Sequence, residues 1–144
     1  MDYTIRKLDI EDIPDVQEIY EMITGQQAPD SDELESRMDY GESLLCVGAE
    51  KNGKLVGFMF GHTERGSYGE MDPIGIIGLL GVHPDFRKNN LGRALGKELL
   101  SQFKGIGITK VRTRVDNNQT DLLKYFMNLG LKPSNWTMLE IDSL

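Results

Sequence analysis

The chain has 144 residues, of which 39% are hydrophobic and 27% charged, as expected for one soluble globular domain with its own core. The net charge of −7 argues against a general nucleic-acid-binding surface, and no apolar run approaches the roughly 18 residues of a membrane helix. The first residues show no secretory signal and the single cysteine excludes an internal disulfide bond, so we expect a cytoplasmic protein that binds neither nucleic acid nor membrane.

The N-terminal third predicts a strand and two helices. Residues 3–8 alternate as a strand does, and Asp9 followed by Asp12 resembles a capping box at a helix start. Gly25 is placed to end that helix, and residues 32–40 predict a short acidic helix. The apolar residues at helical spacing are Ile13, Val16, Ile19, Tyr20 and Ile23.

A hairpin and an apolar strand follow. Residues 44–50 and 54–62 predict strands joined at Asn52-Gly53, a strong hairpin signal. Cys46 lies in the first strand, where a buried small hydrophobe is the expected role. After a polar loop to residue 73, residues 74–82 carry no charge and predict a buried central strand. Glycines within such a strand indicate a bulge or the close approach of another group: Gly75, Gly78 and Gly81.

A basic turn leads from this strand into an amphipathic helix. His83-Pro84 begins the turn, and apolar residues recur along one helix face from Leu91: Leu91, Ala94, Leu95, Leu99 and Phe103. Residues 83–104 hold 5 basic and 2 acidic residues, whereas residues 1–50 hold 3 basic and 14 acidic. A helix N-terminus with basic neighbours favours a phosphate or pyrophosphate.

The last segments complete an alternation of strands and helices. Residues 104–109 predict a turn and residues 110–115 a strand. Asn117 or Asn118 is placed to cap a helix that ends at Gly130, and residues 136–141 predict a final strand. The order predicts an α+β, or mixed α/β, sheet flanked by helices.

Residues 82–95, VHPDFRKNNLGRAL, resemble the acyl-CoA signature V-x-P-x-x-R/Q-x-x-G-x-G/A of the GNAT superfamily of N-acetyltransferases. Gly92 matches the second glycine, and Asn90 replaces the first with the residue that best tolerates a left-handed backbone. Residues 115–131 resemble a second signature of the family, with Leu131 in place of phenylalanine. The resemblance spans nearly the whole chain and implies a single domain, residues 1–144, around a mostly antiparallel, strongly bent sheet.

The resemblance implies acetyl transfer from acetyl-CoA to a primary amine of a small molecule or a protein. It assigns the pyrophosphate to the loop and first helical turn: Arg87, Lys88, Asn89, Asn90, Leu91, Gly92 and Arg93. It assigns the pantetheine arm to the strand end: Leu80, Gly81 and Val82. Asn118, or Gln119 in a shifted register, would contact the cofactor from the other side, unless it is only a helix cap. No Cys/His cluster predicts a metal.

The proton-transfer residues match the family pattern less closely. Phe126 stands where the family usually has the tyrosine that acts as general acid. The side chain of the neighbouring Tyr125 is rotated from that position by about 100° around the helix axis. Tyr125 is the candidate acid and Glu70 the first candidate base, with Asp72 and His62 as alternatives. Each of these side chains also has an ordinary structural interpretation.

Other interpretations stay open at this stage. Because of Phe126 and Asn90, a non-catalytic acyl-CoA-binding or interaction module of the same fold is the alternative function. The glycine fingerprints of dinucleotide-binding and P-loop proteins are missing. The acidic first third fits a cationic acceptor, and dimers are frequent in the family, so a homodimer is one expectation.

Overall fold

The structure is a computed structural model that describes residues 2–39, 45–66 and 69–144. The chain forms two compact units, Met1–Arg114 and Val115–Leu144. The first unit contains β1 (Thr4–Lys7), η1 (Ile10–Asp12), α1 (Ile13–Thr24), α2 (Ser31–Asp39), β2 (Cys46–Lys51), β3 (Lys54–Glu64), β4 (Ile74–Val82), η3 (Pro84–Asn89), α3 (Leu91–Gly105) and β5 (Val111–Thr113). The second contains α4 (Thr120–Asn128).

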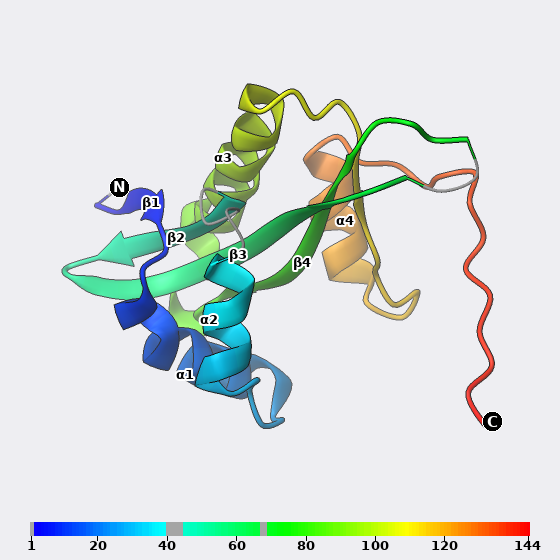
Figure 1. The fold of residues 1–144 in the computed structure, drawn as a ribbon. Coiled ribbons are helices and arrows are strands. Elements are labelled where there is room, and N and C mark those ends of the chain that lie inside the picture. The colour runs from blue at the N-terminus through cyan, green and yellow to red at the C-terminus, as the bar shows by residue number, and fades with distance from the viewer. Residues whose placement is uncertain (1, 40–44, 67–68) are drawn as a thin grey trace. The chain divides into compact units, whose positions relative to one another are not determined.

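The five strands form one sheet in the order β1-β2-β3-β4-β5 (Figure 1). Three neighbouring pairs are antiparallel, and β4 pairs with β5 in parallel. The predicted α+β fold with a mostly antiparallel sheet is therefore confirmed. Residues 74–82 form β4, an interior strand between β3 and the edge strand β5, as predicted, although β3 is the middle strand of the sheet.

The predicted capping box at the start of the first helix is present. The N–H of Asp9 donates to Oδ2 of Asp12 at 2.7 Å, and both terminal nitrogens of Arg6 donate to the same carboxylate at 2.8 and 2.9 Å. Nε of Arg6 also donates to Glu50 at 3.0 Å, which joins β1, β2 and η1. Burial of Asp12 opposes its ionisation, but the bonds from Arg6 and Asp9 lower its pKa below the ordinary value.

The turns predicted from local sequence signals are also confirmed where the structure describes them. Gly25 ends α1 in the left-handed conformation, with φ +68°. Asn52 and Gly53 have positive φ and close the β2–β3 hairpin, as predicted. The short acidic helix forms as α2. Its predicted last residue, Tyr40, and the predicted first residue of the next strand, Leu44, lie outside the described residues.

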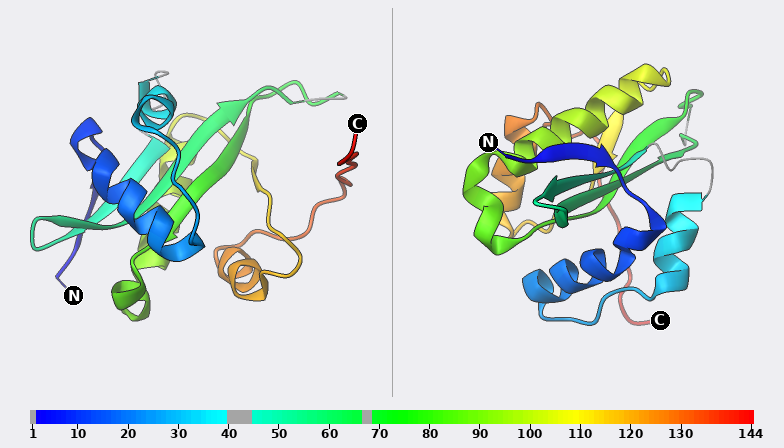
Figure 2. Two further views of the ribbon diagram at one scale, coloured as in Figure 1. Left: turned by 90° about the horizontal axis from the view of Figure 1, so that it is seen from below. Right: turned by 90° about the vertical axis from the view of Figure 1, so that its left-hand side faces the viewer.

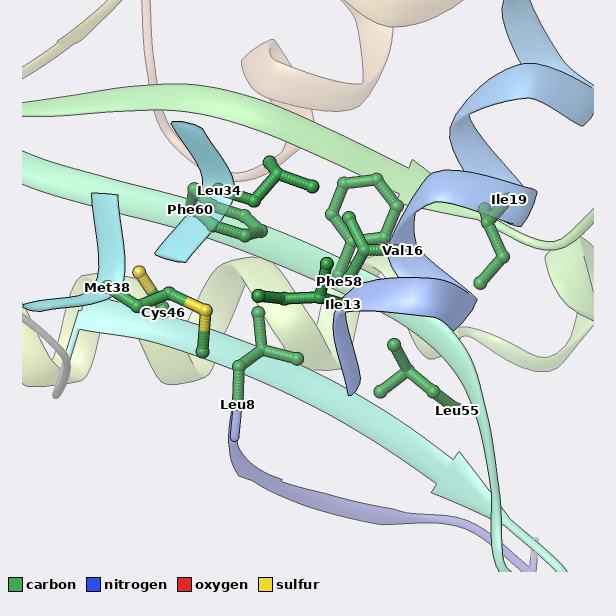
Figure 3. Close-up of a cluster of buried hydrophobic side chains, with 10 residues drawn as sticks. All are labelled: Leu8, Ile13, Val16, Ile19, Leu34, Met38, Cys46, Leu55, Phe58 and Phe60. Atoms are coloured by element: carbon green, nitrogen blue, oxygen red, sulfur yellow. The ribbon is translucent and has the colours of Figure 1, made fainter. Parts of the chain in front are cut away.

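Helices cover both faces of the sheet, with α3 on one and α1 and α2 on the other (Figure 2). Between the sheet and α1 and α2 lies a cluster of ten buried side chains that includes Cys46, as predicted (Figure 3). On the α3 face, sheet glycines allow a close approach. A methyl group at Gly57 would lie 2.7 Å from Leu91, and one at Gly61 would lie 2.9 Å from Phe103.

The second unit confirms the predicted end of its helix at Gly130 but differs from the prediction at the N-cap and in the last strand. Gln119, and neither Asn117 nor Asn118, is the N-cap of α4, and Gly130 follows the helix with φ +107°. Residues 131–144 form no helix or strand, so the strand predicted for residues 136–141 is wrong. An alternating pattern forms a strand only beside a hydrogen-bonding neighbour. Here Leu139 and Ile141 stay 88% and 75% exposed.

Candidate functional site

A β-bulge interrupts β4 at its middle, as its glycines predicted. Leu80 is opposite Met59 of β3 and Ile77 is opposite Gly61, so one β3 residue, Phe60, faces two residues of β4. Those two residues are residues 78–79, and Gly78 is the exposed one. A bulge of this kind changes the alternation of side chains between the faces of a sheet.

The faces of β4 do change across the bulge. Before it, a methyl group at Gly75 would lie 2.8 Å from the Phe103 ring of α3. After it, a methyl group at Gly81 would lie 3.0 Å from Ile23 of α1 and from Phe58. The second half of β4 therefore turns its odd-numbered residues toward α1, although the first half turns them toward α3.

The parallel pairing with β5 covers only the first half of β4. It joins residues 75–77 to residues 111–113. The N–H of Gly75 donates to the carbonyl of Lys110 at 2.9 Å, and Oγ1 of Thr113 donates to the carbonyl of Ile77 at 2.9 Å. Beyond Ile77, β4 continues to Val82 without β5 beside it.

The second half of β4 consequently presents backbone groups along one edge. His83 donates its N–H to Val56 of β3 at 2.8 Å, so Gly81 and His83 face β3. Successive residues of a strand direct their amide groups to opposite edges, and Leu80 and Val82 therefore face the side that β5 does not reach. Nε of Arg87 donates to the carbonyl of Val82 at 3.3 Å, consistent with this direction.

The turn after β4 carries the chain into α3 as the sequence predicted. Nδ1 of His83 accepts the N–H of Asp85 at 3.1 Å, which caps η3 and gives His83 a structural role. The Phe86 ring packs edge-on against His83 and has Nζ of Lys51 5.4 Å from its centre. Asn90 adopts φ +57° and ψ +17°, the left-handed conformation expected of the residue that replaces glycine.

The start of α3 is suited to an anion. The first turn, Leu91, Gly92 and Arg93, points its N–H groups out of the helix end, where the helix dipole is positive. This turn contains no acidic residue, and the side chain of Asn90 forms no capping bond to it. The side chains of Arg87 and Arg93 are exposed beside it. The backbone of Lys88 and Asn89 belongs to η3.

Glu70, the first candidate base, joins the segment before β4 to β5 and the residue that precedes it. Arg112 of β5 donates to both of its carboxylate oxygens, in one case at 3.0 Å, and Nζ of Lys110 lies 3.2 Å away. The Glu70 side chain is only 14% exposed. These contacts support a structural role in pairing the strands. The alternative bases are more open: His62 contacts Glu64 at 3.0 Å, and Asp72 is exposed.

The remaining candidates belong to the second unit. Tyr125 and Phe126 lie on α4 with ring centres 5.1 Å apart, and Phe126 is buried. Burial raises the pKa of Tyr125, which keeps its phenol protonated at neutral pH. Asn118 is exposed, and its N–H donates to Oδ1 of Asp116 at 2.8 Å. The cofactor and catalytic roles of Asn118 and Tyr125 stay predictions.

Sequence reasoning missed two features of this region. The partners of Glu70 are about 40 residues away in the chain, and only the alternating polar face of residues 110–115 hinted at them. Arg37 of α2 lies near Gly78, which no local pattern indicates. In the described part of the chain, no three His, Cys, Asp or Glu side chains gather as metal ligands would, and no helix has the length and apolar content to cross a bilayer.

Comparisons with known proteins show which family and fold this chain resembles. The chain is 33% identical over 90 residues to a mycothiol acetyltransferase from Thermobispora bispora, an alignment that covers 62% of this chain and 30% of that protein. The chain thus spans less than a third of that relative. An aminoglycoside acetyltransferase from an uncultured soil metagenomic sample, crystallised with sisomicin, superposes with a TM-score of 0.78 at 17% identity, covering 99% of this chain and 96% of that one. Glucosamine-6-phosphate N-acetyltransferase from Arabidopsis thaliana superposes with a TM-score of 0.77 at 19% identity, covering 99% and 100%.

The two solved structures have low sequence identity and show the shared fold alone. The sequence profile of the acetyltransferase (GNAT) family matches residues 12–131, most of the chain and both of its signatures. The chain therefore belongs to the GNAT acetyltransferase family.

Proposed function

We propose that this protein transfers the acetyl group of acetyl-CoA to the amino group of a small molecule or a protein. The observation that carries the proposal is the edge of β4 beyond Ile77, which η3 connects to the N-terminus of α3, whose first turn has no acidic residue. An extended amide-bearing chain can pair with the first, and a pyrophosphate suits the second. Acetyl-CoA carries both groups.

The residues present fit this cosubstrate. The pantetheine arm would form backbone hydrogen bonds with Leu80 and with the N–H of Val82. The carbonyl of Val82 already accepts a hydrogen bond from Arg87. Gly81 faces β3 and α1 and would set the position of its neighbours. The pyrophosphate would bind the amides from Lys88 to Arg93, with the exposed Arg87 and Arg93 guanidinium groups as counter-charges.

The chemistry needs few protein groups. The amine lone pair attacks the thioester carbonyl, the C–N bond forms, the C–S bond breaks, and the amine proton leaves to water. A backbone N–H on the open edge of β4 would stabilise the oxyanion of the tetrahedral intermediate. Most of the rate enhancement would then come from positioning the two reactants.

We assign the proton donor for the departing thiolate to Tyr125. Burial raises the pKa of Tyr125, so its phenol carries the proton that a donor must have, although the same shift makes it a weaker acid. Replacing it in Tyr125→Phe should lower kcat about 100-fold and leave the Kd of acetyl-CoA unchanged. Unchanged kcat would show that Tyr125 is an ordinary helix residue.

The cofactor assignment is tested by a matched pair of variants on α3. A bulky side chain in Gly92→Trp should block the first turn and weaken acetyl-CoA binding at least about 100-fold in isothermal titration calorimetry. Gly105→Trp places the same side chain at the other end of the helix, where a methyl group would meet nothing within 4 Å, and should bind normally. Equal affinity in both variants would contradict the assignment.

The same protein preparation can distinguish acetyl transfer from the alternative function, an acyl-CoA-binding module without turnover. Thiol release from acetyl-CoA should depend on added amine and should yield an acetylated product detected by mass spectrometry. Tight binding without product from any amine would favour the binding module, whose motivation is Phe126 at the position usual for the tyrosine.

A further inference from the structure

The face of β4 that points toward α1 and α2 is closed at one end and open at the other. At Gly81 the space above the strand is filled, because an added methyl group would meet Ile23 and Phe58 at 3.0 Å. Among the described residues, an added methyl group at Gly78 would meet nothing closer than 3.9 Å, and Gly78 is exposed. A molecule reaching the second half of β4 from this face therefore has room beside Gly78.

Arg37 of α2 occupies the border of this opening. Its Nη1 is the side-chain atom next to Gly78, 3.9 Å from the position of an added methyl group. Its Nη2 donates to Oε1 of Glu33 at 3.0 Å, one helical turn earlier. The Arg37 side chain is 43% exposed. The guanidinium group is thus held by one nitrogen and presents another beside the open part of β4.

From this geometry we propose that Arg37 binds an anionic group of the acceptor, so that the favoured acceptors are amines that also carry a carboxylate or a phosphate, in place of the purely cationic acceptor that the acidic first third predicts. The planar fork of arginine suits both groups. The inference rests on the proposed acetyl transfer at the edge of β4. It concerns which amine is accepted and leaves the cofactor contacts unchanged.

The spacing is compatible with such an acceptor. Gly78 precedes Leu80, the first residue of the open edge, by two positions, which corresponds to roughly 6–7 Å along a strand. A small molecule with an anionic group beside Arg37 can therefore place its amine near the edge where the thioester would lie. The neighbouring Glu33 partly neutralises Arg37 and so opposes the binding of the anion.

Glu33 also supplies the variant that separates recognition from structure. Arg37→Gln removes the cation and should raise the KM of an anionic acceptor about 10- to 100-fold. Glu33→Gln removes the competing carboxylate and should lower that KM about 2- to 5-fold. If the ion pair only stabilised α2, both variants would change the kinetics in the same direction. Both side chains are exposed, so both variants should fold.

The acceptors are chosen as matched pairs that differ in charge. We would compare 4-aminobutanoate with 4-aminobutanamide, and O-phosphoethanolamine with ethanolamine, at saturating acetyl-CoA. A lower KM for one or both anionic amines, with opposite shifts in Arg37→Gln and Glu33→Gln, is the expected result. The first pair reports carboxylate and the second reports phosphate.

Two other outcomes are distinguishable. Turnover in which neutral amines are used equally well, or in which Arg37→Gln changes nothing, would overturn the role of Arg37 and leave acetyl transfer intact. Binding of acetyl-CoA without acetylation of any amine would overturn the proposed function, and the role of Arg37 with it.

Discussion

The first half of β4, residues 74–77, lies between β3 and β5, whereas the second half, residues 78–82, pairs with β3 and, of the strands that the structure describes, with no other. Both halves are uncharged and contain glycine. In the first half, glycine makes room for α3, since Gly75 lies against Phe103. In the second half, Gly78 lies in the bulge and is exposed. Glycine thus allows close packing against α3 at Gly75, and at Gly78 it leaves the backbone of the strand accessible.

The largest effect should come from filling the two glycine positions in turn. Gly75→Val places a methyl group 2.8 Å from a ring that is itself buried and packed near Gly61, and should lower the free energy of unfolding by about 3 kcal/mol. Gly78→Val meets no such neighbour and should change it by less than about 0.5 kcal/mol. Chemical denaturation measures both. Equal losses would contradict the distinction between the halves.

A smaller effect should follow from removing the Glu70–Arg112 ion pair, which joins the segment before β4 to β5. Arg112→Gln removes the bidentate hydrogen bonds to the largely buried Glu70 and should lower the free energy of unfolding by about 2 kcal/mol. Acetyl-CoA affinity should stay within about twofold, because the open edge begins beyond this pair. Lys110→Gln is the control, since its ammonium group is 57% exposed and should contribute less than about 1 kcal/mol. A large loss of affinity in Arg112→Gln would show that the two halves are coupled.

Local signals predicted much of this architecture. The capping box at Asp9, the turns at Gly25 and Asn52, and the left-handed Asn90 each depend on residues within a few positions of one another. The start of α3 was located for the same reason, since a helix end and its nearest side chains are contiguous in sequence, and its binding of an anion stays a prediction.

What was missed depends on contacts between distant segments. The length of the β4–β5 pairing and the partners of Glu70 follow from where β5 lies, about 40 residues later. The predicted strand at residues 136–141 had the right alternation, but alternation alone cannot supply a hydrogen-bonding neighbour. The catalytic residues stay predictions, because Phe126 stands at the position where the family usually has its tyrosine and Tyr125 stands beside it.

The smallest effect should come from removing the Arg6–Asp12 ion pair. This pair lies away from β4, so its loss should change the free energy of unfolding and leave cofactor binding unchanged. The pKa of Asp12 is lowered in the folded state, so its ionised form stabilises the fold above the unfolded pKa of about 3.9 and this contribution is lost as pH falls below it. Asp12→Asn should cost about 1–2 kcal/mol at pH 7. The difference from wild type should shrink below about pH 4.

Thermal and chemical unfolding between pH 7 and pH 3 measure this dependence. The exposed Asp2 offers a control, since Asp2→Asn should leave stability unchanged across the range. A difference between Asp12→Asn and wild type that stays constant down to pH 3 would contradict the assignment of the stabilisation to the carboxylate. Normal acetyl-CoA binding in Asp12→Asn would show that loss of stability elsewhere does not affect the second half of β4.

The most direct test of the central claim is amide hydrogen exchange along β4, resolved by residue and measured with and without acetyl-CoA. The account predicts that the N–H groups of Leu80 and Val82 gain protection on binding, together with those of the first turn of α3. The N–H of Gly75, already bonded to Lys110, should change little by comparison. Saturating binding of acetyl-CoA without added protection at Leu80 and Val82 would contradict the claim that the open half of β4 holds the cofactor.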